Sequence, residues 1–265
     1  MKIIRVPKKK EMRYRRISEE IINFLRMEFK KRNKTKAIVG ISGGIDSAVT
    51  SSLCKKAGLD LYVTNLAYKK RGLTEAKKVI EYLDLPKSKI SYIDITPLVD
   101  LQIRKIQKII KLDKISIGNI FPRQRMIIQY ALASRLNALV VGTQNLSEYC
   151  LGYFTTYGDQ AFDTCPIAGL WKSQVYQLAK YLKIPEIIVE REPSGDLWPR
   201  LTDEKDLGFN YEYADEIMHL LFVRRYTKRE IVARYGFNSK LVDKVSNRIK
   251  ITDYKRRDIP KCYFI

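Results

Sequence analysis

A short glycine-rich run near the N-terminus constrains the fold of this chain more than any other feature. The apolar residues 37–39 lead into the octet Gly40-Ile41-Ser42-Gly43-Gly44-Ile45-Asp46-Ser47, and a helix-compatible segment follows it. This order predicts a buried strand, a tight turn and a helix start. Adjacent glycines allow backbone conformations that other residues resist, so successive N–H groups can point into one concavity at the positive end of the helix. The octet therefore predicts a phosphate site.

The octet carries an acid where mononucleotide loops of the Walker type carry a lysine. Carboxylate oxygens are ligands that Mg2+ prefers, so an acid beside a phosphate site indicates a divalent cation between the two. We expect Asp46 to hold Mg2+, and Ser42 and Ser47 to donate hydroxyl hydrogen bonds to phosphate oxygens. The alternative is an ordinary glycine turn in which Ser47 is the helix N-cap.

Length and composition favour one domain. A chain of 265 residues can bury one substantial core, and no break in composition marks a second. We expect a single domain over 1–265, with a basic helical segment at 1–36, a core at 37–208 and a helical C-terminal extension at 209–265. No apolar run approaches the roughly 20 residues of a membrane span, and the basic N-terminus lacks the apolar stretch of a signal peptide. A cytoplasmic protein without membrane contact is expected.

The rarer residues exclude several chemistries. The four cysteines lack C-x-x-C spacing, which argues against a zinc site, an iron–sulfur cluster or a disulfide framework. The only histidine, His219, falls in a predicted helix and supports no histidine-centred triad. A formal charge of +21 attracts polyanions, so nucleotides and nucleic acids both fit. The chemistry must therefore come from phosphate binding, metal and charge.

Strand-like and helix-like segments alternate through the core. Strands are predicted at 37–41, 61–66, 90–95 and 139–142, after a basic helix at 18–31. Helices are predicted at 47–57, 74–83 and 97–110 and, after a long loop, at 170–182. This alternation is typical of an α/β fold with a doubly wound, mainly parallel sheet, which binds ligands at the carboxyl ends of its strands. Gly142 and Thr143 should therefore share a rim with the octet, and Glu148 should complete the metal site.

The octet resembles the SGGxDS pyrophosphate loop of N-type ATP pyrophosphatases, which cleave ATP between its α and β phosphates and adenylylate a substrate. The resemblance implies an adenine-nucleotide alpha hydrolase-like fold. Further runs resemble successive motifs of the NAD synthetase family: GNIFPRQRM at 118–126, GTQNLSE at 142–148, GYFTTYGD at 152–159 and PSGDLW at 193–198. DYKRR at 253–257 resembles the basic motif at the end of that family more weakly.

The resemblance implies a ligase that amidates deamido-NAD (nicotinic acid adenine dinucleotide). The substrate carboxylate attacks the α-phosphorus of MgATP and releases pyrophosphate, and ammonia then displaces AMP from the acyl adenylate. Glutamine-using members carry a separate amidase domain, for which this chain has no room, so free ammonia is the expected donor unless another subunit supplies it. The implied partners are ATP, deamido-NAD and ammonia, with Mg2+ as cofactor. Members of the family work as homodimers that share substrate sites across the interface.

Roles follow from the resemblance residue by residue. Gly40 to Ser47 would cradle the ATP phosphates, with Asp46 and Glu148 as Mg2+ ligands, Lys172 neutralising phosphate charge, and Thr143 and Ser194 hydrogen-bonded to ATP. Asp46, Glu148 and Lys172 are then the catalytic residues. The positions that match deamido-NAD contacts are Arg123, Thr156, Asp163, Tyr254 and Lys255.

Taken alone, several of these residues have ordinary interpretations. Lys172 would be a solvated lysine at a helix start, Glu148 a surface acid and Asp163 a turn residue. Arg123 and Arg125 lie two apart on a predicted helix, about 200° around its axis, so both are not expected to face one ligand. Arg125 would then form a structural ion pair. Trp171 and Trp198 are expected to pack or anchor loops.

The chain departs from the family pattern on the dinucleotide side. Thr156 replaces a usual lysine, Tyr254 a common histidine and Gln160 a common glycine, and the segment 66–77 is shorter than usual. A paralogue that uses another carboxylate therefore remains an alternative. The basic charge also leaves a tRNA-modifying ATP pyrophosphatase open. Residues 228–248 have the helix–glycine turn–helix pattern of a nucleic-acid-binding module, or of two helices that pack on the core.

Overall fold

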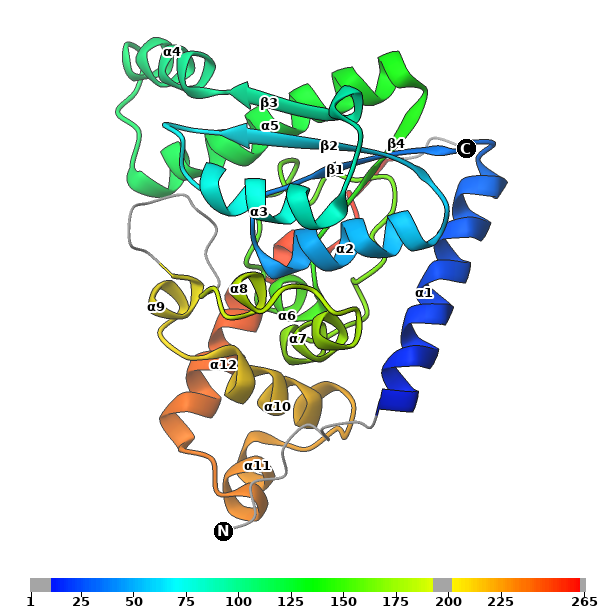
Figure 1. Ribbon diagram of the computed structural model, residues 1–265. Coiled ribbons are helices and arrows are strands. Elements are labelled where there is room, and N and C mark those ends of the chain that lie inside the picture. The colour runs from blue at the N-terminus through cyan, green and yellow to red at the C-terminus, as the bar shows by residue number, and fades with distance from the viewer. Residues whose placement is uncertain (1–10, 193–201, 263–265) are drawn as a thin grey trace.

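A four-stranded parallel sheet lies between two layers of helices (Figure 1). The computed structural model describes residues 11–192 and 202–262. The strand order is β3-β2-β1-β4, and every pairing is parallel. The strands are β1 (Lys36–Gly40), β2 (Asp60–Ala67), β3 (Ile90–Asp94) and β4 (Ala138–Val141). The predicted parallel α/β sheet is confirmed, and each strand lies within one residue of its expected bounds.

Helices cover both faces of this sheet (Figure 1). α2 (Ile45–Lys56) and α3 (Leu73–Leu83) lie on one face, and α4 (Thr96–Gln107) and α5 (Lys114–Leu136) lie on the other. Alternate residues of a strand point to opposite faces. Val39 accordingly packs in the cluster that contains α2, whereas Ile38 packs against Ala133 of α5. Burial on both faces explains why β1 and β4 are apolar runs rather than alternating ones.

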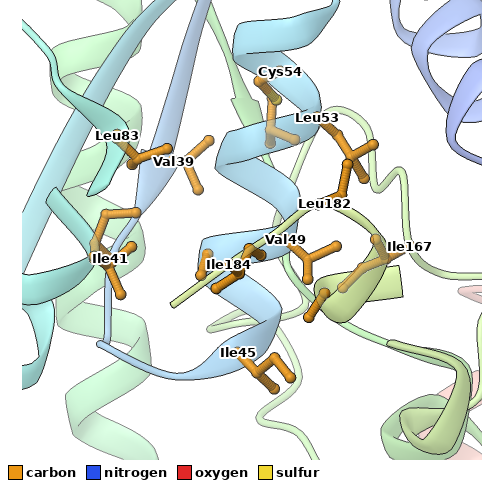
Figure 2. Packing of buried hydrophobic residues seen from close by; sticks show 14 of the residues in the cluster. Val39, Ile41, Ile45, Val49, Leu53, Cys54, Leu83, Ile167, Leu182 and Ile184 are labelled. Carbon is orange, nitrogen blue, oxygen red and sulfur yellow. The ribbon is translucent and has the colours of Figure 1, made fainter. Parts of the chain in front are cut away.

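The largest core cluster lies between the sheet and the helices on the α2 side. Val39 and Ile41 meet Val49 and Leu53 of α2 there, together with Ile184 (Figure 2). α1 (Glu11–Lys31) and α7 (Lys172–Tyr181) pack against the same cluster. The core therefore holds rigid the strand that precedes the octet and the helix that follows it.

One helix inside the expected long loop was missed. Residues 143–171 contain α6 (Leu146–Leu151), which begins at the N-cap Asn145. The Asn145 side chain accepts a hydrogen bond from the Glu148 N–H at 3.0 Å, and the Glu148 carboxylate accepts one from the Asn145 N–H at 3.2 Å. This reciprocal capping box explains how so short a helix is stabilised.

The C-terminal extension is helical, as predicted, and contains α10 (Tyr211–Phe222), α11 (Lys228–Tyr235) and α12 (Ser239–Ile251). Two short helices that were not predicted, α8 (Glu186–Val189) and α9 (Asp203–Leu207), precede it. The short 3-10 helices η1 (Lys87–Lys89) and η2 (Asp253–Arg256) complete the described elements. Ile231 of α11 and Val242 and Val245 of α12 are buried in one cluster with Ile217 of α10. The helix–turn–helix segment thus uses its apolar sides for packing. Within 11–192 and 202–262, no helix is long and apolar enough to cross a bilayer.

Candidate functional site

A cavity of about 670 Å³ lies at the carboxyl ends of β1, β2 and β4. Most of the residues chosen from the sequence line it: Gly40, Ile41, Ser42, Gly44, Ile45, Asp46, Ser47, Thr143, Glu148, Lys172, Tyr254 and Lys255. The predicted shared rim of the octet and the Gly142-Thr143 turn is therefore confirmed. His219 is not among the lining residues.

The octet forms a tight turn into α2. Gly43 has a φ of +84°, which favours glycine, and Gly44 is the extended N-cap of the helix. Ser42 Oγ accepts a hydrogen bond from the Gly44 N–H at 3.2 Å, whereas Ser47 Oγ donates one to the Gly44 carbonyl at 2.8 Å. The interpretation of Ser47 as the N-cap is therefore wrong. The first turn of α2 nevertheless presents its positive end to the cavity, as an anion site requires.

A buried ammonium group lies between two carboxylates at the mouth of this turn. Lys172, the first residue of α7, is 2 % exposed. Its Nζ contacts Asp46 Oδ2 and lies 3.6 Å from Glu148 Oε1. Burial by itself lowers the pKa of Lys172, but the two carboxylates outweigh it and hold that pKa well above its ordinary value. The interpretation of Lys172 as a solvated lysine is therefore wrong.

Burial and the Asp46 charge raise the pKa of Glu148, and the Lys172 ammonium partly offsets them. The Glu148 side chain is only 18 % exposed and faces the cavity, so it is not an ordinary surface acid. Three charged groups from α2, α6 and α7 thus meet at one point.

Asn145 orients both carboxylates, although sequence reasoning assigned it no role. Its side-chain Nδ2 donates a hydrogen bond to Asp46 Oδ1 at 3.0 Å, and the capping box ties it to Glu148. Asn145 itself is fully buried. The Asn-x-x-Glu spacing that opens α6 was the available signal, because it is a helix-start pattern.

The carboxylates fit a divalent cation that is also held by phosphate. Asp46 and Glu148 converge on the single Lys172 ammonium, so their oxygens already face one cation. Among the residues that the structure describes, no three His, Cys, Asp or Glu side chains gather as a complete metal cage. Mg2+ keeps several waters and binds through one or two carboxylates plus substrate phosphates, so a pair of acids beside a phosphate loop suits it.

Arg125, rather than Arg123, lines the cavity. Arg125 Nε donates to the Leu66 carbonyl at 3.0 Å. Arg123 is exposed on α5, and its Nε donates to the Thr156 carbonyl at 3.3 Å, outside the cavity lining. The expectation that the two arginines do not share one ligand-facing direction agrees with this arrangement. Within one chain, however, Arg125 lines the cavity, whereas the family resemblance assigned Arg123 to the substrate.

Asp163 and Thr156 also lie outside the cavity lining. The Asp163 carboxylate accepts a hydrogen bond from the Val140 N–H at 2.7 Å, and the Asp163 carbonyl accepts one from Arg32, in the turn after α1, at 2.7 Å. Asp163 therefore ties a loop to the edge of β4. Ser194 and Trp198 lie outside the described residues, whereas Trp171 is buried in the C-terminal cluster, as expected of a packing residue.

The C-terminal basic motif reaches the cavity from η2. Lys255 Nζ donates to the carbonyls of Gly152 at 2.9 Å and Phe154 at 2.6 Å. Burial, together with the neighbouring Arg248, lowers the pKa of Lys255. Lys255 thereby ties the C-terminus to the 152–159 loop, and Tyr254 beside it is 69 % exposed.

We expect Gly43→Ala to abolish nucleotide binding. A Cβ at Gly43 would lie 2.5 Å from Glu75 Cβ and 2.6 Å from the Ala76 backbone N, so α3 would have to move. The left-handed backbone adds about 1–3 kcal/mol of strain. Calorimetric titration with ATP and a thermal melt measure both effects. Gly169→Ala is the matched control, because its Cβ would meet no atom within 4 Å. Normal ATP affinity in Gly43→Ala would contradict the assignment of the turn.

Comparisons with known proteins agree with this geometry. The NAD synthase family model matches residues 17–259. The chain is 38% identical to an NH(3)-dependent NAD(+) synthetase of Fusobacterium nucleatum over 254 residues, which is 94% of this chain and 96% of that protein.

Two solved structures are similar to this one. NMN synthetase from Francisella tularensis has a TM-score of 0.83 at 30% identity, over 95% of this chain and 99% of that one. NH3-dependent NAD synthetase from Campylobacter jejuni has a TM-score of 0.76 at 29% identity, with the same coverage. The matched region contains the octet, the charged cluster and the C-terminal basic motif, and the chain belongs to the NAD synthase family.

Proposed function

We propose that this chain is an ammonia-dependent NAD synthetase, which uses ATP to amidate deamido-NAD and releases AMP and pyrophosphate. The observation that carries the proposal is the meeting of Asp46, Glu148 and Lys172 beside the phosphate turn in one cavity. Relatives named NH(3)-dependent NAD(+) synthetase support it along nearly the whole chain.

The site needs to position and stabilise charge rather than move protons. A carboxylate substrate is already a nucleophile, and pyrophosphate leaves readily once its charge is neutralised. The N–H groups of the octet and the start of α2 would bind the phosphates, and Thr143 and Ser194 would hydrogen-bond ATP. The Lys172 side chain would turn its ammonium from the two carboxylates toward the leaving pyrophosphate and neutralise its charge. Asp46 and Glu148 would hold Mg2+, which supplies further charge neutralisation on the phosphates.

The acceptor side of the cavity is lined by Arg125, Tyr254 and Lys255. We assign these residues to the anionic end of deamido-NAD within one chain. Arg123, Thr156 and Asp163 remain proposed contacts of the same substrate, and the exposure of Arg123 suits a contact made across an interface.

A homodimer would place Arg123 in such an interface. Exposed apolar side chains gather on α4, α5 and their connection, namely Leu98, Leu101, Ile106, Ile109, Ile110, Ile115 and Ile127. An apolar patch of this kind marks an interaction surface. Arg123 and Ile127 are one turn apart on the same face of α5. If a second copy covers this face, Arg123 lies in the interface and can contact the substrate of that copy.

We expect Ile127→Arg to convert the dimer to a monomer, because it puts a charge among these apolar side chains. Ile127 is 50 % exposed, so the fold should tolerate the change. Light scattering after size-exclusion chromatography measures the mass. Met27→Arg is the control, because Met27 is 64 % exposed on α1, away from the patch. A wild-type monomer, or a variant that remains dimeric, would contradict the interface.

Two further expectations are retained as proposals. Contacts between α10 and α7 join the C-terminal extension to the core, which supports a single domain over 1–265. Cys54, Cys150, Cys165 and Cys262 are free thiols, which suits a reducing, cytoplasmic compartment.

The deciding experiment measures AMP and NAD formation by purified protein with MgATP, deamido-NAD and ammonium. Equal amounts of both products, absent without deamido-NAD, are expected. The mononucleotide counterpart of the acid is the comparison substrate, since a similar structure is that of an NMN synthetase. If only the mononucleotide is turned over, deamido-NAD is not the acceptor, but the adenylylation site is retained. If the protein binds ATP and turns over neither acid, both the acceptor and the adenylylation site are wrong.

A further inference from the structure

A buried carboxylate outside the cavity joins the two helices that carry Glu148 and Lys172. Asp215 lies on α10, in the C-terminal extension, and is fully buried. Its Oδ1 accepts a hydrogen bond from the Ser147 hydroxyl, and its Oδ2 accepts one from the Ser173 N–H at 2.9 Å. Ser147 Oγ in turn accepts a hydrogen bond from the Lys172 N–H at 2.8 Å. The network connects α10, α6 and α7 at a single point.

The next residue along α10 shows that burial alone does not produce such a network. Glu216 is also buried, at 5 % exposure, but its Oε1 has no hydrogen-bond partner among the described residues. Burial raises the pKa of both acids, and the Ser147 and Ser173 hydrogen bonds oppose that shift at Asp215 only. A buried carboxylate is costly unless it is hydrogen-bonded, so the partners of Asp215 determine how it is accommodated.

The network acts where the backbone positions the charged cluster. Ser147 immediately precedes Glu148 on α6, and Lys172 and Ser173 are the first two residues of α7. The first N–H groups of a helix lack partners within it. Here Ser147 and Asp215 accept from the N–H groups of Lys172 and Ser173, so they tie the start of α7 to the first turn of α6.

We propose that Asp215 is a positioning residue for adenylylation: it locks the start of α7 against α6 and so keeps the Lys172 ammonium aimed at the carboxylates and the phosphates. Asp215 does not line the cavity and acts only through Ser147 and the backbone of α7. The proposal rests on the proposed function for its kinetic consequence, but its structural consequence is independent of the substrate.

Asp215→Asn tests the link with little change in volume. An amide accepts hydrogen bonds at only one of the two positions, so either the Ser147 hydroxyl or the Ser173 N–H loses its acceptor at residue 215. We expect kcat to fall about 10–100-fold, the effect typical of losing an outer partner of a charged site, with KM for ATP changed less than about twofold. Ser147→Ala should lower kcat similarly, and the double variant should fall no further because both changes break one link. Glu216→Gln is the matched control and should keep its kcat.

Hydrogen exchange measured by mass spectrometry provides a readout that needs no turnover. Amides in the peptide that contains Lys172 and Ser173 should exchange faster in Asp215→Asn than in wild type. In Glu216→Gln they should exchange at the wild-type rate. If a thermal melt shows that Asp215→Asn does not fold, kcat and hydrogen exchange are measured on Ser147→Ala instead. Unchanged exchange in this peptide, or equal kcat losses in Asp215→Asn and Glu216→Gln, would overturn the proposal. If wild type makes no NAD but exchange in this peptide is still faster in Asp215→Asn, the positioning role of Asp215 stands and only the proposed reaction is rejected.

Discussion

Asp46→Asn is expected to lower AMP formation by about 10³-fold, because charge stabilisation by a bound metal is worth several kcal/mol and each 1.4 kcal/mol is tenfold. An asparagine keeps the shape of Asp46 but removes the charge that contacts Lys172 and faces the phosphate turn. The fold should survive, because Glu148 stays 3.6 Å from the ammonium. AMP release under saturating MgATP measures the effect, and Mn2+ titration reports the lost metal ligand separately.

Asp60→Asn is the matched control for this variant. Asp60 is the first residue of β2, so it lies at the amino ends of the strands, opposite the carboxyl ends that border the cavity, and its carboxylate pairs with Lys89 at 2.6 Å. The same chemical change there should leave AMP formation within about twofold of wild type, since partly exposed pairs contribute little. Normal turnover in Asp46→Asn would remove both the metal assignment and the catalytic assignment.

Lys172→Met should lower kcat by about 10²–10³-fold, the range seen when one charge-stabilising donor is removed from a transition state. It should also lower the melting temperature. Removing one member of a buried ion pair leaves the other uncompensated, at a typical cost of about 3–5 kcal/mol. Asp46 and Glu148 would then lie near each other without the ammonium that separates their charges.

Added Mg2+ should restore much of the melting temperature of Lys172→Met, because the cation would take the position of the ammonium between the carboxylates. Without ATP, the same addition should shift wild type less, since the Lys172 ammonium then contacts both carboxylates. Lys89→Met is the control, because it breaks the partly exposed pair with Asp60. Equal Mg2+ shifts in Lys172→Met and wild type would show that the ion binds elsewhere.

Residue roles on the dinucleotide side were harder to infer than those on the ATP side. The octet is contiguous, so its turn can be inferred from local backbone preferences alone. Arg123 and Arg125 are two residues apart on a helix of 23 residues, and only the packing of α5 decides which one faces the cavity. Asp163 was chosen by its place in a motif, yet its carboxylate is used on the edge of β4.

The sequence by itself determined the order of strand, glycine turn and helix, the parallel sheet and the shared rim, because hydrophobic periodicity and glycine placement act over a few residues. Only the tertiary structure decided that Lys172 is buried between Asp46 and Glu148. It alone placed Asp215 behind them, 43 residues along the chain from Lys172. Such contacts join α2, α6, α7 and α10, and their geometry depends on how helices pack across the whole core rather than on any local pattern.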